Sequence, residues 1–360
     1  MRKEEIIRRF SCMSEAELNQ MVEVYKKYKP QKNNDQQLFS IPEHIKKLTE
    51  GFKGDTMLKR ILEDLPTHLT PIEAPSKNLA EKAKKIYMEN CFCFDEIGEI
   101  FVHTVLEYAT FKKARPLIIY GPAGGGKSHR VSVMAKMVGL HRFNANIPLS
   151  TNTGGLAGFE GSFQNSAPGL IVKGMIESQS CNYLFNGEEL DKQAWFDRQP
   201  PFSDQFLKLL DQDATNFIDN RLGFGVNASH IIYVFTANDK TRISAPMLDR
   251  CEIIELLPPT KKEVTNIIRN GILPQSLERF RDNAEISFSE EAINFVIDSL
   301  WQGDNTSIRQ YQSLISKCVN AANYTCICEE RPVIIQRSDA EIQLRKMSAA
   351  ITPKNRIGFA

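Results

Sequence analysis

The sequence predicts an α/β fold in which a parallel sheet is flanked by helices and followed by a helical C-terminal part. Short continuous apolar runs at 116–120, 182–185 and 230–238 are typical of strands buried on both faces. Patterns with helical periodicity separate these runs, and strands that alternate with helices indicate a parallel sheet covered on both sides. From about residue 260 the pattern is helical again, apart from a short apolar run at 332–336.

The first 78 residues predict helices joined by polar connections. Ser14 and Glu17 form a capping-box pattern inside a helical stretch at 1–29. A Pro-started polar segment at 30–37 and a second one at 67–78 are typical of linkers. Further helices are expected at 41–52, 56–65, 79–91, 96–111, 261–273, 289–301 and 306–324.

Composition argues against several classes of protein. The 45 basic and 44 acidic residues give a net charge of +1, which is not the charge of a polybasic nucleic-acid binder. The charged start is unlike a signal peptide, and no apolar run approaches the roughly 18 residues of a membrane span. The eight cysteines include the C-x-C pairs Cys91/Cys93 and Cys326/Cys328, whose spacing is not typical of zinc sites. We therefore expect reduced, mostly buried thiols and a cytoplasmic location.

A phosphate-binding loop is the strongest motif. Residues 121–128 fit the pattern G-x-x-x-x-G-K-[ST], between an apolar run and an amphipathic helix. Glycines let backbone amides surround phosphate oxygens, the lysine reaches the β- and γ-phosphates, and the serine hydroxyl binds Mg²⁺. The sequence thus predicts binding of ATP and Mg²⁺ by Gly121, Pro122, Ala123, Gly124, Gly125, Gly126, Lys127 and Ser128.

Two adjacent acids, Glu188 and Glu189, follow the run at 182–185. Taken alone, such a pair is more often a solvated helix start. Beside a phosphate loop, we expect Glu188 to hold Mg²⁺ and Glu189 to polarise the attacking water. The first acid is usually Asp, and Asn186 and Gly187 stand where apolar residues are usual. The sequence therefore predicts a hydrolytic site that works but is weakened, on a strand that Asn186 and Gly187 make less stable.

Several stretches, taken in order, resemble one family, the AAA+ ATPase module of the Lon proteases. They are "APGLIVKGM" at 167–175, "GEELDK" at 187–192, "FSDQFL" at 202–207 and "FTANDKTRISAPMLDRCEIIEL" at 235–256. The resemblance covers roughly residues 55–360 and implies an AAA+ P-loop NTPase fold. The implied domains are an N-terminal helical region (1–78), a large α/β subdomain (79–258), a helical lid (259–348) and a tail (349–360).

The resemblance also implies roles for single residues. Asn238 would be sensor 1, which hydrogen-bonds the γ-phosphate or its water. Arg250 would be an arginine finger offered to a neighbouring subunit, and Arg309 would be sensor 2. Phe163 would be the pore-loop aromatic that grips polypeptide, although Glu160 and Gly161 replace the family's basic pair. Without the resemblance, each arginine would be read as a surface ion pair. For Phe163 the alternative is a core aromatic, but the flanking Gly158, Gly161, Ser162 and Asn165 favour a loop.

The expected function is that of an ATP-driven, chaperone-like ring, hexameric in the family's manner, that remodels, unfolds or translocates a protein. The Lon peptidase domain should follow the lid, where this sequence ends, so no proteolysis is expected from the chain, although a separate peptidase subunit is compatible with it. One alternative is a nucleotide-controlled assembly switch with slow or no hydrolysis. A second is a motor acting on nucleic acid, which the near-neutral charge disfavours.

Overall fold

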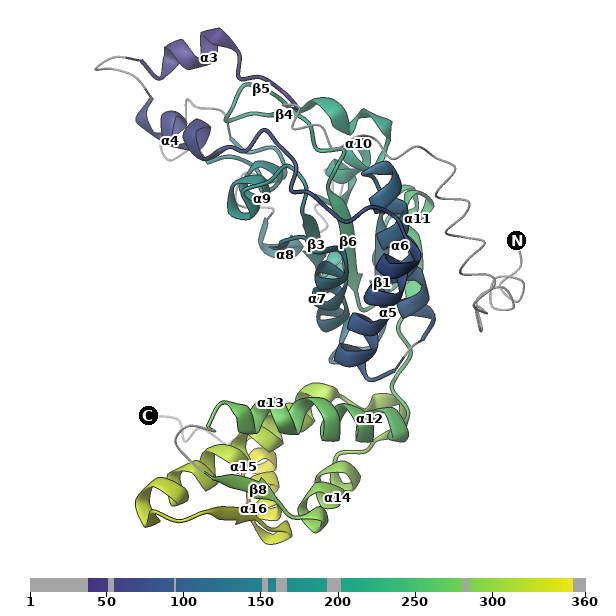
Figure 1. Ribbon diagram of the computed structural model, residues 1–360, viewed down its shortest axis with the longest axis vertical. Coiled ribbons are helices and arrows are strands. Elements are labelled where there is room, and N and C mark those ends of the chain that lie inside the picture. Colours follow the sequence, from purple (N-terminus) through teal and green to yellow (C-terminus); the bar gives the residue numbers. More distant parts are fainter. Residues whose placement is uncertain are drawn as a thin grey trace, which may run out of the picture. The chain divides into compact units, whose positions relative to one another are not determined.

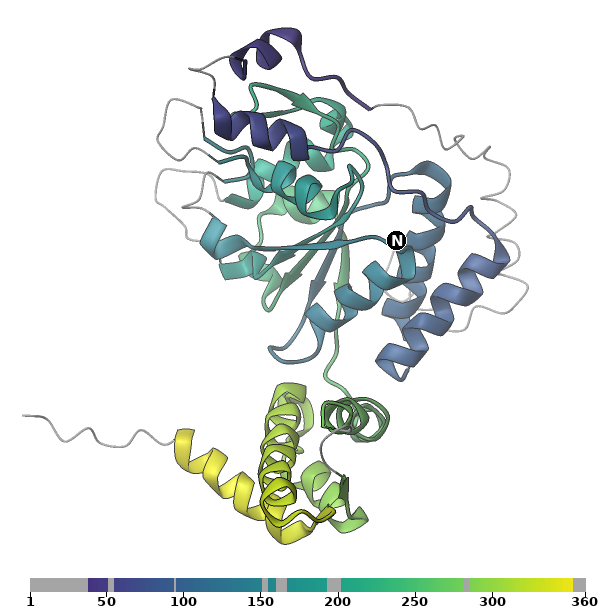
Figure 2. The ribbon, with the colours of Figure 1, turned by 60° about the vertical axis from the view of Figure 1, so that its left-hand side comes forward.

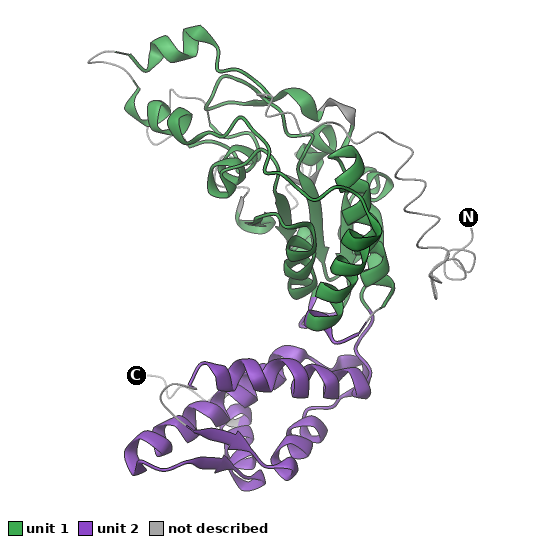
Figure 3. Ribbon diagram, viewed as in Figure 1, with its two compact units in different colours: residues 1–89, 94–121, 127–256 green, residues 90–93, 122–126, 257–360 purple. Residues whose placement is uncertain are grey.

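The computed structural model describes residues 38–50, 55–93, 95–150, 155–159, 167–192, 202–280 and 285–351. The chain divides into two compact units (Figure 3). The first is drawn from residues 1–89, 94–121 and 127–256, and the second from 90–93, 122–126 and 257–360. Each unit has its own buried apolar core. The helix and linker expected over residues 1–37 lie outside the described residues.

A five-stranded parallel sheet forms the centre of the first unit (Figure 1, Figure 2). The strand order is β2-β3-β6-β1-β7, so β6 lies between β3 and β1. The predicted α/β fold with a parallel sheet is confirmed. The five strands are β1 (Leu117–Tyr120), β2 (Arg142–Asn146), β3 (Leu184–Glu188), β6 (Ile232–Ala237) and β7 (Glu252–Glu255).

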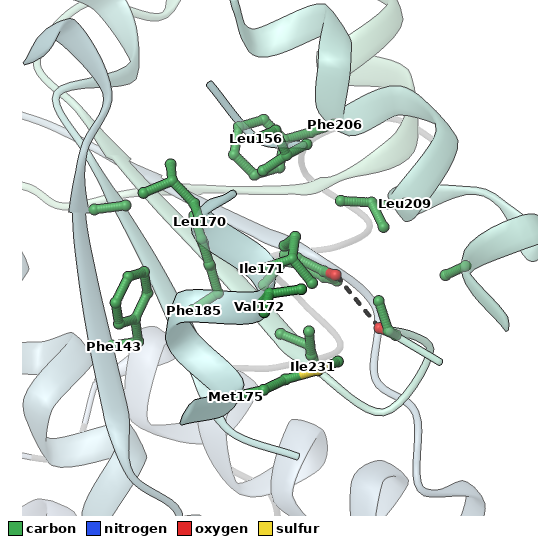
Figure 4. Packing of buried hydrophobic residues seen from close by; sticks show 14 of the residues in the cluster. Phe143, Leu156, Leu170, Ile171, Val172, Met175, Phe185, Phe206, Leu209 and Ile231 are labelled. Carbon is green, nitrogen blue, oxygen red and sulfur yellow. Dashed lines mark hydrogen bonds between the residues drawn. The ribbon is translucent and has the colours of Figure 1, made fainter. Parts of the chain in front are cut away.

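Helices flank this sheet, as the alternating pattern predicted. Buried side chains of α9 and α10 pack with Phe185 and Phe206 in one apolar cluster (Figure 4). The rings of Phe185 and Phe206 lie 5.3 Å apart at their centroids. The described helices up to residue 256 are α3 (Glu43–Leu48), α4 (Thr56–Asp64), α5 (Lys77–Cys91), α6 (Glu96–Phe111), α7 (Lys127–Val138), α8 (Ile147–Ser150), α9 (Leu170–Ser178), α10 (Leu207–Leu210) and α11 (Ala245–Arg250).

The segment that carries α3 and α4 shares the core of the first unit. Ile45 of α3 and Leu58 of α4 are buried in the same cluster as Phe185. The Asp55 carboxylate caps α4 by accepting the Leu58 amide (2.8 Å). It also pairs with Arg221, a guanidinium that is only 4% exposed, at 2.6 Å. These contacts tie the segment to the core of the first unit.

The second unit is largely helical, as predicted. After α12 the chain makes a π-helical turn at Ile268–Ile272 before α13 begins. Two short parallel strands, β8 and β9, pair beside the helices. The described elements from residue 257 onward are α12 (Lys261–Ile267), α13 (Leu273–Glu278), β8 (Ile286–Phe288), α14 (Glu290–Ser299), α15 (Ile308–Glu329), β9 (Val333–Ile335) and α16 (Arg337–Ile351).

Several strands were not predicted. In β2 only Phe143 and Ala145 are buried, because β2 is an edge strand of the sheet, and the polar residues between them resemble a loop in sequence. The hairpin of β4 (Phe217–Asp219) and β5 (Phe224–Val226) was missed because each strand has only three residues. Among the described helices, none is long and apolar enough to span a bilayer.

The expected softening of β3 is not observed. Asn186 and Gly187 lie inside the strand and pair with β2 on one side and β6 on the other. Glycine fits this position because a Cβ at residue 187 would lie 2.5 Å from the ring of Phe235. Close packing against that ring therefore takes the place of the apolar side chain that is usual at this position.

Candidate functional site

The loop between β1 and α7 turns sharply where the phosphate motif lies. Gly121 follows β1 directly, and a Cβ at this position would lie 2.3 Å from the carbonyl oxygen of Leu256. Gly126, just before α7, has a φ of +96°, which side-chain-bearing residues rarely adopt. Local geometry therefore favours glycine at both positions.

Lys127 brings three parts of the chain together. Its Nζ donates to the carbonyl of Gly121 at 2.8 Å and to Oδ1 of Asn238 at 2.8 Å. Asn238 comes directly after β6, the neighbour of β1 in the sheet. Because parallel strands end at the same edge of a sheet, the two segments meet although 111 residues separate them. The structure thus unites the lysine of the phosphate motif with the residue expected to be sensor 1.

The two acids separate at the end of β3. Glu188 is the last residue of the strand and is half-buried, and its Oε1 accepts a hydrogen bond from Nδ2 of Asn186 at 3.1 Å. Glu189 has a φ of +59°, and its carboxylate pairs with Lys192 at 2.6 Å. A left-handed conformation costs a residue other than glycine about 1 kcal/mol or more, and such residues cluster at functional sites. Neither acid is a fully solvated surface residue.

Glu188 lies on the sheet face that α7 covers. In the register of the two strands, Leu184, Asn186 and Glu188 of β3 lie beside Arg142, Asn144 and Asn146 of β2. Side chains alternate between the two faces along a strand, so all six of these side chains share one face. Arg142 donates from Nη1 to the carbonyl of Ser128, at 3.1 Å, in the first turn of α7. The face that carries Glu188 is therefore the one on which Ser128 lies, in the first turn of α7.

The loops after β3 and β6 are joined. The amide of Asp239 donates to Oδ2 of Asp191 at 3.3 Å, and Asp191 is only 3% exposed. Next to Asp239, Lys240 lies over the ring of Tyr120, 4.7 Å from its centroid, and donates to its hydroxyl at 3.0 Å. Burial and a hydrogen bond with Glu255 raise the pKa of Tyr120 above its ordinary value, so the phenol stays neutral. These contacts fix the position of the loop that follows Asn238.

Arg250 lies elsewhere on the first unit, at the end of α11. Its Nε donates to Oδ1 of Asp211 at 2.8 Å, and its Nη1 donates to the carbonyl of Pro246 at 3.1 Å. The hydrogen bond to Asp211 raises the pKa of the Arg250 guanidinium. Among the described residues, the guanidinium hydrogen-bonds Asp211 and Pro246, which lie away from the phosphate loop in the sequence.

Two remaining candidates are placed differently. Arg309 is exposed in the first turn of α15, in the second unit. Phe163 lies outside the described residues. Within the described residues, no group of three or more His, Cys, Asp or Glu side chains could hold a metal ion. Of the cysteines described there, Cys328 is exposed, Cys93 is intermediate and the buried ones are Cys91, Cys181, Cys251, Cys318 and Cys326.

Comparison with known proteins identifies relatives of one kind, although no family model matches the chain. The Lon protease of Helicobacter pylori is 31% identical over 188 residues, 52% of this chain and 22% of its own. The Lon protease of Clostridioides difficile is 27% identical over 276 residues, 74% of this chain and 34% of its own. The peroxisomal Lon protease homolog 2 of Pichia angusta is 32% identical over 172 residues, 48% of this chain and 18% of its own.

The predicted resemblance to the Lon proteases is confirmed. It extends over about half to three quarters of the chain, as a Lon-like AAA+ module would. The chain spans about a fifth to a third of the length of the curated relatives it matches.

Sequence reasoning missed three residues of this candidate site. Arg142 anchors the first turn of α7, Asp191 holds the loop after Asn238, and Asn186 contacts Glu188. Each is a polar side chain with a specific partner beside the phosphate loop or the acidic pair. The available signal was Asn186, a polar residue directly after the apolar run at 182–185, where an apolar residue is usual.

Proposed function

We propose that the chain is a Mg²⁺-dependent ATPase of the Lon-like AAA+ type that does mechanical work on proteins. The observation that carries this proposal is the contact between Lys127 and Asn238, with Glu188 at the end of the next strand. One cation, one amide and one carboxylate thereby lie at the carboxyl edge of three adjacent strands. In open parallel sheets, ligands bind at this edge.

The residues fit ATP and Mg²⁺ chemically. Ser128 and Glu188 offer the oxygen ligands that Mg²⁺ prefers, from the same face of the sheet. When bound, Mg²⁺ neutralises charge on the phosphate oxygens. Lys127 would exchange its present acceptors for phosphate oxygens, so that its ammonium group forms charge-assisted hydrogen bonds with the nucleotide. The backbone amides of the loop bind the same phosphates.

Hydrolysis requires a base and a group that orients water. Glu189 takes the proton of the attacking water at its carboxylate after it leaves Lys192, its present partner at 2.6 Å. Asn238, held next to Lys127, offers an amide that orients this water or the γ-phosphate.

Arg250 and Arg309 supply positive charge in an assembled ring. Arg250 is held by Asp211 at the surface of the first unit, and it acts in trans on the ATP of a neighbouring copy. Arg309 acts from α15 as sensor 2. A homo-oligomer, hexameric in the family's manner, is therefore part of the proposal, with Phe163 as the residue that grips a polypeptide substrate or one presented by an adaptor.

Cleavage of peptide bonds is not part of this proposal. A separate peptidase subunit would complete degradation if one exists, and the cytoplasm is the proposed location. Because the formal charge is only +1, nucleic acid is the less favoured substrate.

An assembly switch with slow hydrolysis is the second candidate. The observation in its favour is that Glu189 is engaged by Lys192, while Glu stands at position 188 in place of Asp. In that case ATP would bind and change assembly without rapid turnover.

Steady-state ATPase turnover, measured alone, with an unfolded protein and with DNA, separates these functions. The proposal predicts Mg²⁺-dependent turnover that rises with unfolded protein and not with DNA. Stimulation by DNA alone would favour a nucleic-acid motor. Nucleotide-dependent assembly with no turnover under any of the three conditions would favour the switch.

A further inference from the structure

A fully buried amide lies in the middle of the parallel sheet. Asn186 is 0% exposed, and its neighbours in register are Asn144 on β2 and Val234 on β6. Strands of this kind normally carry apolar side chains at every position, because a buried polar group costs free energy unless it is hydrogen-bonded. The Oδ1 of Asn186 has no hydrogen-bond partner among the described residues. The side chain therefore needs an explanation.

Both hydrogen bonds recorded for this side chain come from its Nδ2. One goes to Oδ1 of Asn144 at 2.9 Å, and the other to Oε1 of Glu188 at 3.1 Å. An amide nitrogen has two hydrogens, so both donors of Asn186 are used. Asn186 and Glu188 are two residues apart in β3 and therefore lie on one face, the face that α7 covers.

We propose that Asn186 is a positioning residue for the Mg²⁺ ligand Glu188. This inference rests on the proposed ATPase function. Glu has one methylene more than Asp, and its carboxylate can occupy more positions. The bond from Asn186 restrains one oxygen of Glu188, which leaves the other oxygen to face Mg²⁺. Asn186 and Glu188 thus act together where an apolar residue and an Asp are usual.

A purely structural role is the competing explanation. In that case Asn186 would serve to pair with Asn144 and fix the register of β2 on β3. The two roles depend on different partners. Asn144 is exposed, so Asn144→Val removes the bond between the strands and leaves the bond to Glu188 intact. This variant is the matched control.

The test measures binding of Mn²⁺, a spectroscopic substitute for Mg²⁺, in the complex with a non-hydrolysable ATP analogue. Electron paramagnetic resonance gives the affinity without any turnover. Asn186→Val should weaken Mn²⁺ binding by about tenfold, which is typical for loss of a group that orients a metal ligand. Asn144→Val should change it by less than about twofold. Asn186→Ala serves the same comparison if the valine variant does not fold.

Repeating the measurement in the Glu188→Asp variant tests whether the effect of Asn186 depends on the longer side chain of Glu188. A shorter carboxylate needs no restraint, so in Glu188→Asp the further change Asn186→Val should cost less than about threefold. Unchanged Mn²⁺ affinity in folded Asn186→Val would overturn the proposal, and so would an equal loss in both backgrounds. Failure of the wild type to bind the nucleotide at all would instead remove the proposed ATPase function, and with it this inference.

Discussion

The Nζ of Lys127 lies 2.8 Å from Oδ1 of Asn238, which joins the first residue of α7 to the residue that follows β6. The same Nζ also binds the carbonyl of Gly121. A lysine that makes two such bonds is oriented before a ligand arrives. In the proposed function, a phosphate group would replace these acceptors with charged oxygens, and bonds to charged groups are the stronger ones.

Removal of this lysine should weaken ATP binding strongly. Hydrogen bonds to charged groups contribute about 1.5–3 kcal/mol each, so Lys127→Ala should weaken ATP binding by about 100-fold or more. Isothermal titration calorimetry measures this loss. Lys136→Ala, on the exposed side of the same helix, is the control and should bind ATP as the wild type does. Unchanged affinity in Lys127→Ala would refute the assignment of the phosphate loop.

Arg250 should act between copies of the chain. Arg250→Ala should leave ATP binding intact and remove hydrolysis, because the guanidinium is needed only for the charge that develops during phosphoryl transfer. Glu189→Gln should also be inactive, since an amide cannot act as a base. Mixtures of the two variants should regain part of the turnover, at interfaces where an intact Arg250 meets an intact Glu189.

The mixing experiment has its own control. Each variant is also measured alone at the total protein concentration of the mixture, and both of these samples should stay inactive. If no mixture of Arg250→Ala with Glu189→Gln gains activity, shared sites in a ring are ruled out. The contact of Arg250 with Asp211 would then be a surface ion pair, which is the interpretation of this arginine without the family resemblance.

The sequence predicted the parts of the site that depend on local pattern. Residues 121–128 lie in one continuous stretch, so motif and context were both visible. The sheet core was visible because β1 and β6 are apolar on both faces. β2 was not visible, because an edge strand with Asn144 and Arg142 on its polar positions resembles a loop.

The polar contacts of the site could not be predicted in this way. Asn186 was expected to weaken β3, whereas the structure shows it paired within the strand and bonded to Glu188. That bond depends on the register of β3 and on a rotamer, neither of which is encoded in a short motif. The link between Asp191 and Asp239 likewise depends on the adjacency of β3 and β6.

The buried thiols should react more slowly with an alkylating reagent than the exposed thiol. Burial raises the pKa of Cys181 and of Cys251 to about 12 from an ordinary value of 9.0. Only the thiolate reacts with iodoacetamide, and at pH 8 about one in ten thousand such thiols is ionised. Native labelling followed by mass spectrometry should therefore modify the exposed Cys328 and spare these two. Rapid labelling of Cys181, which donates to the carbonyl of Pro66, would contradict the fold around it.

The same pKa shifts give the sign of a pH effect on stability. A thiol whose pKa is raised in the folded state loses its proton more readily in the unfolded state. These two thiols therefore stabilise the fold fully below pH 9.0, and this contribution is lost as the pH rises toward about 12. The free energy of unfolding in urea should accordingly fall above pH 9.0, and Cys181→Ser should reduce the dependence.

The central claim is that Glu188 and Glu189 form a working hydrolytic site, and one measurement tests it most directly. ATPase turnover is compared between the assembled wild type and Glu189→Gln, with Mg²⁺ and an unfolded protein present. The account predicts that the variant binds ATP as tightly as the wild type. Its turnover should be slower by about 100-fold or more, as expected for loss of a general base. A wild type with no turnover above that of Glu189→Gln would contradict the account and leave a nucleotide-binding switch.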